Sequence, residues 1–316
     1  MESLVFCLNA ILPIFIMIVL GKLLARWGGA DKSFMSKLNA FSFKWLIPAM
    51  LFLNIYDSDI RTAFDPKLLI FSFSGTVAMF LISWVLSARL LPRGKVASFT
   101  QACFRGNYNL MAIPLVTGLL GADMLPKALV MSPVFIALYN VLSVTIFTLY
   151  AKDAAKTGLR RVGAVLFGII KNPFMIAMFL ALPFSIFDIS LPVLIHKPIE
   201  YMSDMATPVA LIALGGSLTI KSLKENFSVS LTAAAVKTII TPLIMVPLAI
   251  FLGFRGVDLG IIAILFSTPM AVNCYAMAVE LGGDGELTSG AILLSTILSV
   301  VSLVSTMTLL MHFGLV

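Results

Sequence analysis

The chain has 316 residues, of which 60% are hydrophobic and 12% are charged, and its formal net charge is +7. A mean hydropathy of +1.05 leaves too little polar surface for a soluble globular protein of this size. The composition therefore predicts an all-α polytopic membrane protein.

Ten apolar segments follow one another along the chain, each close to the ~20 residues that a helix needs to cross a bilayer. They run over residues 4–26, 34–56, 67–91, 98–119, 125–150, 162–185, 198–220, 227–252, 258–281 and 287–312. The first segment does not fit a cleaved signal peptide, because its basic residues, Lys22 and Arg26, follow the apolar run instead of preceding it. We therefore expect ten transmembrane helices.

The basic residues are distributed unevenly between alternate loops. Loops after the first, third, fifth and seventh segments carry thirteen lysines and arginines, and the other loops carry five. The positive-inside rule makes the first set cytoplasmic, so both termini are expected on the outer side of a bacterial inner membrane. Because the basic excess follows topology, it does not indicate nucleic-acid binding.

Two of the apolar segments are interrupted at corresponding places. One reads Phe-Arg-Gly-Asn-Tyr-Asn-Leu-Met-Ala-Ile-Pro over residues 104–114, and the other reads Phe-Ser-Thr-Pro-Met-Ala-Val-Asn-Cys-Tyr over residues 266–275. Counting ~1.5 Å per residue places both interruptions about 15 Å deep, near the middle of a ~30 Å hydrocarbon core. Matched interruptions of this kind point to the substrate site of a transporter.

Further matches extend the correspondence between the two halves. At an offset of 160, Pro13 aligns with Pro173 and Pro48 with Pro208, while the interruptions align at an offset of 162. Each half contains an odd number of segments, so the second half must enter the membrane in the opposite sense. We expect a 5+5 inverted repeat of residues 1–150 and 162–316, joined by a short cytoplasmic linker over residues 151–161, with the fourth and ninth helices broken and crossed.

The interruptions carry a family resemblance. Residues 107–114 resemble the crossover of the auxin efflux carrier family, which reads Asn, variable residues and then Met-Gly-Ile-Pro, although Ala112 stands where the family often has glycine. Residues 269–278, followed by 282–284 and 295–296, resemble the second crossover and the last span. The resemblance covers essentially the whole chain, and bile-acid–sodium symporters and sodium–proton antiporters are similar more widely.

This resemblance implies secondary transport of small organic anions such as auxin, malate or malonate. It also implies an elevator mechanism, in which the first, second, sixth and seventh spans form a scaffold, and spans 3–5 and 8–10 form the moving transport domain. A homodimer formed through the scaffold is implied as well. Asn54 is expected at the interface between scaffold and transport domain.

We expect the substrate site at the two interruptions, where carboxamides and freed backbone groups can bind a carboxylate. The candidate binding residues are Asn107, Asn109, Asn273 and Pro269, surrounded by Arg105, Tyr108, Thr268 and Tyr275. The residues expected to shape the breaks and the scaffold are Gly106, Pro114, Pro48 and Pro208.

Three charged residues inside the segments leave alternatives open. Arg105 could bind a substrate carboxylate or extend to the cytoplasmic headgroups. Lys237 is too deep for either surface and should have a carboxylate or carbonyl partner. Asp204 could be that partner or a proton carrier, or could simply be exposed near the outer surface.

The leading hypothesis is a secondary carrier for a mono- or dicarboxylate, with H⁺ or Na⁺ as the candidate coupling ion and no cofactor. The alternatives are a sodium-coupled symporter, although the interruptions contain no acidic residue, and a membrane sensor that does not transport. An intramembrane enzyme is disfavoured, because neither a nucleophile–base pair nor a metal-ligand cluster stands out. The sequence thus predicts a transporter without catalytic or metal-binding residues.

Overall fold

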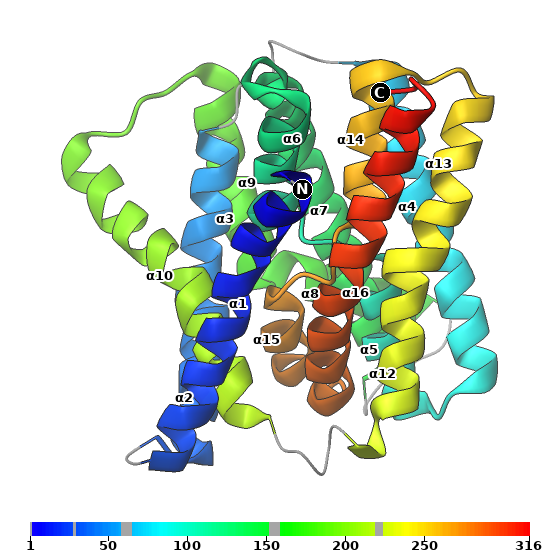
Figure 1. Ribbon diagram of the computed structural model, residues 1–316. Helices are drawn as coiled ribbons and strands as arrows, with labels where there is room; N and C mark the ends of the chain where they lie inside the picture. The colour runs from blue at the N-terminus through cyan, green and yellow to red at the C-terminus, as the bar shows by residue number, and fades with distance from the viewer. Residues whose placement is uncertain (1, 28–29, 58–64, 152–158, 219–223) are drawn as a thin grey trace.

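The computed structural model describes residues 2–27, 30–57, 65–151, 159–218 and 224–316. Within these ranges the chain is almost entirely helical, and the only β contact is a single bridge (Figure 1). The helices are α1 (Glu2–Trp27), α2 (Lys32–Phe41), η1 (Ser42–Leu46), α3 (Ile47–Tyr56), α4 (Pro66–Leu90), α5 (Arg93–Phe104), η2 (Tyr108–Ala112), α6 (Ile113–Leu120), η3 (Ala122–Met124), α7 (Leu125–Tyr150), α8 (Leu159–Lys171), α9 (Pro173–Phe187), α10 (Val193–Ser217), α12 (Phe227–Ala235), η4 (Val236–Ile240), α13 (Thr241–Phe251), α14 (Gly256–Ser267), α15 (Asn273–Glu280) and α16 (Gly285–His312).

Five helical stretches within the described ranges are long and apolar enough to cross a membrane. They are Lys32–Tyr56, Pro66–Leu90, Lys127–Tyr150, Phe227–Phe251 and Gly285–His312. A sixth is added if α8 and α9, which meet at an angle of 65°, count as one bent span. The expected apolar, multi-helical architecture is therefore present. Much of the expected linker, residues 152–158, lies outside the described residues.

The fourth and ninth predicted segments are each divided into two short helices, as the sequence predicts. α5 ends at Phe104 and the helix resumes at Tyr108, while α14 ends at Ser267 and α15 begins at Asn273. Figure 1 shows α6 and α14 in the upper half of the molecule and α5 and α15 in the lower half. The two interruptions therefore meet near the middle of the structure.

Three π-helical turns share one sequence feature. η1, η2 and η4 each end two residues before a proline, namely Pro48, Pro114 and Pro242. Since proline has no N–H and its ring clashes with the carbonyl four residues earlier, a wider turn relieves both problems. Pro48 and Pro114 therefore follow π turns near the start of an α-helix, and neither residue lies in a break.

Glycines allow α1 and α10 to pack with their backbones in close contact. A Cβ atom on Gly21 would lie 2.3 Å from the Ile212 carbonyl oxygen, and one on Gly215 would lie 2.0 Å from the Ile18 carbonyl oxygen. Glycine is therefore required at both positions. Pro208 lies inside the continuous helix α10, which also packs against α2 and α3.

An ion-pair cluster joins the N-terminal ends of α4, α7 and α14. The Lys127 ammonium lies 3.0 Å from the Asp65 carboxylate and also pairs with Asp258. Asp65 additionally caps α4 by accepting a 3.1 Å hydrogen bond from the Leu68 amide. This backbone bond, with further help from Lys127, holds the pKa of Asp65 below its ordinary value.

Candidate functional site

The two interruptions cross and hydrogen-bond to each other. The Asn107 amide donates to the Pro269 carbonyl at 2.9 Å, and the Ala271 amide donates to the Arg105 carbonyl at 3.3 Å. Gly106 and Met270 thereby form an antiparallel bridge. Backbone groups that each break releases are satisfied by the other break, as a membrane interior requires.

Gly106 permits this close approach. A Cβ atom at this position would lie 2.7 Å from the Thr268 hydroxyl oxygen and 3.4 Å from the Lys237 ammonium nitrogen. Its role is therefore to make room for neighbouring side chains from the second half of the chain. The φ angle of Gly106 is not positive, so glycine is needed there for space and not for a left-handed backbone conformation.

A cavity of about 200 Å³ adjoins the crossing. One wall belongs to α3 and α10, and the other belongs to the two crossing segments and α7. The lining residues are Ile47, Met50, Leu51, Asn54, Arg105, Gly106, Asn107, Tyr108, Ile136, Tyr139, Ala206, Thr207, Ala210, Ala271, Val272 and Asn273. Asn54 lies on the wall formed by α3, and Arg105 is the only charged residue among these described lining residues.

Arg105 is held inside the protein. Its guanidinium donates to the Asn140 carboxamide oxygen at 2.9 Å and to the Ser143 hydroxyl at 3.1 Å, both on α7, and it also contacts the Met277 sulfur at 3.2 Å. The residue is 3% exposed, so the alternative of extension to the headgroups is wrong. No ion pair links Arg105 to a carboxylate among the described residues.

Two half-helices begin at the cavity. Asn107 precedes η2 without forming a side-chain capping bond, and Val272 precedes α15 in the same way. Helix N-termini present free amides and a partial positive charge, both of which favour an anion. Asn273, the first residue of α15, has a buried Oδ1 that finds no hydrogen-bond partner within the described structure.

The remaining predicted site residues differ in their relation to the cavity. Tyr108 lines it with its ring, but its hydroxyl donates to the Ala128 carbonyl of α7 at 2.8 Å. Thr268 is fully buried and donates to the Leu265 carbonyl at 2.9 Å. Pro269 and Tyr275 are not among the lining residues, because Pro269 contributes its backbone to the crossing and Tyr275 hydrogen-bonds with Ser217. The side chains of Asn109 and Pro114 lie outside the described residues.

Of the alternatives left open for Asp204, pairing with Lys237 is wrong. Lys237 is 1% exposed, and its ammonium donates to the Phe266 carbonyl at 2.9 Å. Asp204 is exposed on α10. The carbonyl partner that was the other expectation for Lys237 is confirmed.

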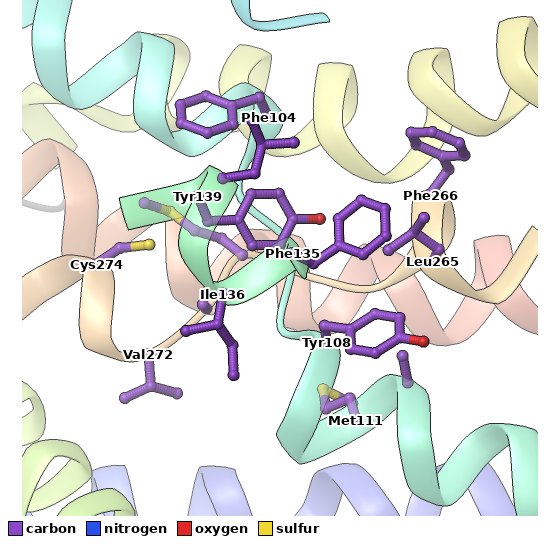
Figure 2. Close-up of a cluster of buried hydrophobic side chains, with 14 of the residues drawn as sticks. Phe104, Tyr108, Met111, Phe135, Ile136, Tyr139, Leu265, Phe266, Val272 and Cys274 are labelled. Carbon is purple, nitrogen blue, oxygen red and sulfur yellow. The ribbon is translucent and has the colours of Figure 1, made fainter. Parts of the chain in front are cut away.

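Sequence reasoning missed the contribution of α7. Asn140 and Ser143 fix the Arg105 guanidinium, and Tyr139 lines the cavity while its hydroxyl bonds with the Gly106 backbone. Figure 2 shows Tyr139 grouped with Tyr108 and Phe135 in the apolar cluster around the crossing. The available signal was a set of polar residues at helical spacing inside an apolar segment.

The part of the chain that the structure describes contains no group of three or more histidine, cysteine or acidic residues placed to bind a metal ion. The described lining of the cavity combines one arginine and the carboxamides of Asn54, Asn107 and Asn273 with the N-termini of η2 and α15.

Comparison with known sequences agrees with this arrangement. A sequence model of the family described as membrane transport protein matches residues 6–307. The chain belongs to this family. The resemblance to auxin efflux carriers is thereby confirmed, and the apolar helices make this transport protein a multi-pass membrane protein.

Three relatives match this membrane transport protein over nearly their whole length, and all three are named as transporters. An uncharacterized transporter of Methanothermobacter thermautotrophicus is 26% identical over 298 residues, covering 93% of this chain and 95% of its own. A Rhizobium meliloti protein, which is named as a proposed malonate transporter, is 26% identical over 297 residues, covering 92% and 91%. A transporter of Methanocaldococcus jannaschii is 22% identical over 302 residues, covering 92% and 95%.

Proposed function

We propose that this transporter is a secondary active carrier for a small mono- or dicarboxylate and not an enzyme. The observation that carries the proposal is Arg105, a buried cationic residue that is the only charged one among the described residues lining the cavity. Transferring an unpaired charge into the protein is costly, and a substrate carboxylate would compensate it. The name of the malonate-transporter relative supports the same substrate class.

The size of the cavity fits a small mono- or dicarboxylate. Its volume of about 200 Å³ is below the ~300–1,000 Å³ typical of sites for larger organic ligands. One carboxylate would contact Arg105 and the N-termini of η2 and α15, while the carboxamides of Asn107 and Asn273 would provide further hydrogen bonds. A monocarboxylate needs one such contact region, and a dicarboxylate would also use Asn54 or Thr207 on the opposite wall.

The mechanism that we propose is an elevator. The cavity lies between α3 and α10 on one side and the crossing segments on the other, so motion of one side past the other would carry the substrate. α10 contributes Ala206 and Ala210 to the cavity, and small side chains suit a sliding surface. The proposed arrangement has ten spans in a 5+5 inverted repeat, with a scaffold built from the first, second, sixth and seventh spans.

We further propose a bacterial inner-membrane location with both termini outside, and a homodimer formed through the scaffold. These features follow from the loop charges and the family resemblance. A sodium-coupled symporter of the bile-acid type is the alternative carrier, but none of the described residues that line the cavity is acidic. A sensor would bind a carboxylate without moving it, and flux measurements separate the two.

Uptake of radiolabelled malonate into proteoliposomes tests the proposal. Asn107→Ala and Asn273→Ala should each reduce uptake and weaken ligand-induced thermal stabilisation. The backbone of Asn107, and not its side chain, forms the crossing bonds, so folding should be retained. Thr268→Ser is the matched control, because this hydroxyl lies outside the cavity. Wild-type uptake by both alanine variants, or uptake of no carboxylate by the native protein, would contradict the assignment.

A further inference from the structure

Lys237 is a buried cation that the anion cavity does not use. It is 1% exposed, it is absent from the cavity lining, and it forms no ion pair with any carboxylate that the structure describes. An unpaired ammonium is expensive to place inside a membrane protein, and such groups are functional candidates. The position of this ammonium therefore calls for an explanation.

The ammonium lies at the point where the two broken helices cross. Its nitrogen is 2.9 Å from the Phe266 carbonyl oxygen and 3.4 Å from the place that a Cβ atom on Gly106 would occupy. The same point is 2.7 Å from the Thr268 hydroxyl oxygen. Figure 2 shows Phe266 with Leu265 at the edge of the apolar cluster around the crossing. Lys237 thus reaches from η4 to both interruptions.

The carbonyl end of α14 explains the attraction. Helix ends carry unpaired carbonyls and a partial negative charge, which a nearby cation stabilises. In α14 the Thr268 hydroxyl satisfies the Leu265 carbonyl, and Lys237 satisfies the Phe266 carbonyl. In carriers with discontinuous helices, the carbonyl ends of half-helices and the unwound backbone are also the groups that bind a coupling Na⁺.

The helix that carries Lys237 is adapted to this position. Lys237 is the second residue of the π-helical turn η4, in which Thr241 donates to the Val236 carbonyl through its amide and its hydroxyl. Pro242 follows as the second residue of α13 and cannot donate an amide hydrogen bond back to this turn. Single π turns within α-helices occur frequently at functional sites.

We propose that Lys237 is a tethered cation that takes the place of a bound metal cation at the crossing. Given the carrier proposed above, its transport cycle then needs no Na⁺ at this point. Removing the ammonium without filling its volume should leave the Phe266 carbonyl and the Thr268 hydroxyl as ligands for a small monovalent cation. Filling the volume with an uncharged side chain should leave no such site.

Thermal unfolding of detergent-solubilised protein in sodium chloride and in N-methylglucamine chloride tests this inference. The wild type should melt at the same temperature in both salts. Lys237→Ala should be stabilised by sodium, with a shift on the order of 3 °C at saturation. Lys237→Met, which replaces the stem but not the charge, should show no response, and Lys237→Arg should behave as the wild type.

A folded Lys237→Ala that melts at the same temperature in both salts would overturn the inference, and so would sodium-specific stabilisation of the wild type. If Lys237→Ala cannot be purified, Lys237→Ser is measured by the same criterion, and the wild-type comparison decides if neither variant folds. None of these measurements needs a carboxylate. A sodium response of the alanine variant would therefore support the tethered cation even if carboxylate transport failed.

Discussion

The Asn107 amide donates a 2.9 Å hydrogen bond to the Pro269 carbonyl, and these two residues are also the pair that the 162-residue offset matches. In a regular antiparallel pair, facing residues can exchange two such bonds. Pro269 has no N–H and cannot return the second one. The Asn107 carbonyl instead accepts from the Met111 and Ala112 amides, so the two sides of the crossing differ chemically.

Arg105→Gln should weaken carboxylate binding on the order of 10–100-fold, because a charge-assisted hydrogen bond contributes about 1.5–3 kcal/mol. Titration of malonate followed by thermal shift measures this change. Arg105→Lys keeps the charge but cannot keep both α7 contacts in the same geometry, so it should be intermediate. Equal malonate affinity in the wild type and Arg105→Gln would remove Arg105 from the site.

Gly106→Ala should destabilise the protein by about 1–3 kcal/mol, because the new methyl group would overlap the Thr268 hydroxyl. Thr268→Ala removes that hydroxyl. The double variant should therefore be more stable than the sum of the two single changes predicts, by about 0.5–2 kcal/mol. If the changes in the free energy of unfolding were strictly additive, the overlap between the new methyl group and the Thr268 hydroxyl would be relieved by movement of other groups.

Gly215→Ala should lower the melting temperature markedly, because a Cβ atom there would collide with the Ile18 backbone and no side chain could move aside. Gly163 is the matched control, since a Cβ atom on it would meet nothing within 4 Å. Gly163→Ala should be neutral or stabilising by up to ~1 kcal/mol, as expected for a helix position. A similar fall in melting temperature in both variants would argue against close packing of α1 and α10.

Lys127→Met should destabilise the protein by about 1 kcal/mol, because two partly exposed ion pairs are lost and two carboxylates remain near each other. Lys127→Arg should retain most of the stability. The difference in stability between the wild type and Lys127→Met should shrink in high salt, which screens charges near the surface. Melting temperatures at low and high ionic strength provide the measurement.

The pKa of Asp65 is lowered in the folded state, so its carboxylate stabilises the fold when ionised. This contribution is complete above the unfolded-state pKa of about 3.9 and is lost as the pH falls through the lower folded value. Asn can still cap α4, so Asp65→Asn removes mainly the charge. The stability difference between the two proteins should therefore be constant at neutral pH and should decline below about pH 4.

Local signals predicted the breaks well. Pro269 acts on the backbone within a few residues, so its effect can be read without knowing which helices are neighbours, whereas the space that Gly106 provides depends on Thr268 and Lys237. Pro114 was misread as part of a break, because the alternative of a π turn depends on the carbonyls that the preceding turn can still satisfy. The position of each break can therefore be predicted from nearby residues, whereas the type of helical turn beside it cannot.

Side-chain partners were harder to predict. The depth of Arg105 left two directions open, and the packing of α7 against α5 decided between them. Asp204 and Lys237 each had a plausible depth, but pairing also requires that both side chains turn toward each other. The cavity wall on α3 and α10 likewise depends on which faces of distant helices meet, and only Asn54 was anticipated there.

The crossing has a consequence for synthesis of the protein at the ribosome. Arg105 and its partners on α7 are complete early, but the backbone that satisfies Asn107 is made only when Pro269 has emerged, 162 residues later. Until then the first break must rely on water, lipid headgroups or the insertion machinery for its hydrogen bonds. The centre of the molecule is therefore among the last parts to mature, and a nascent chain truncated before α14 would expose this unfinished break to quality control.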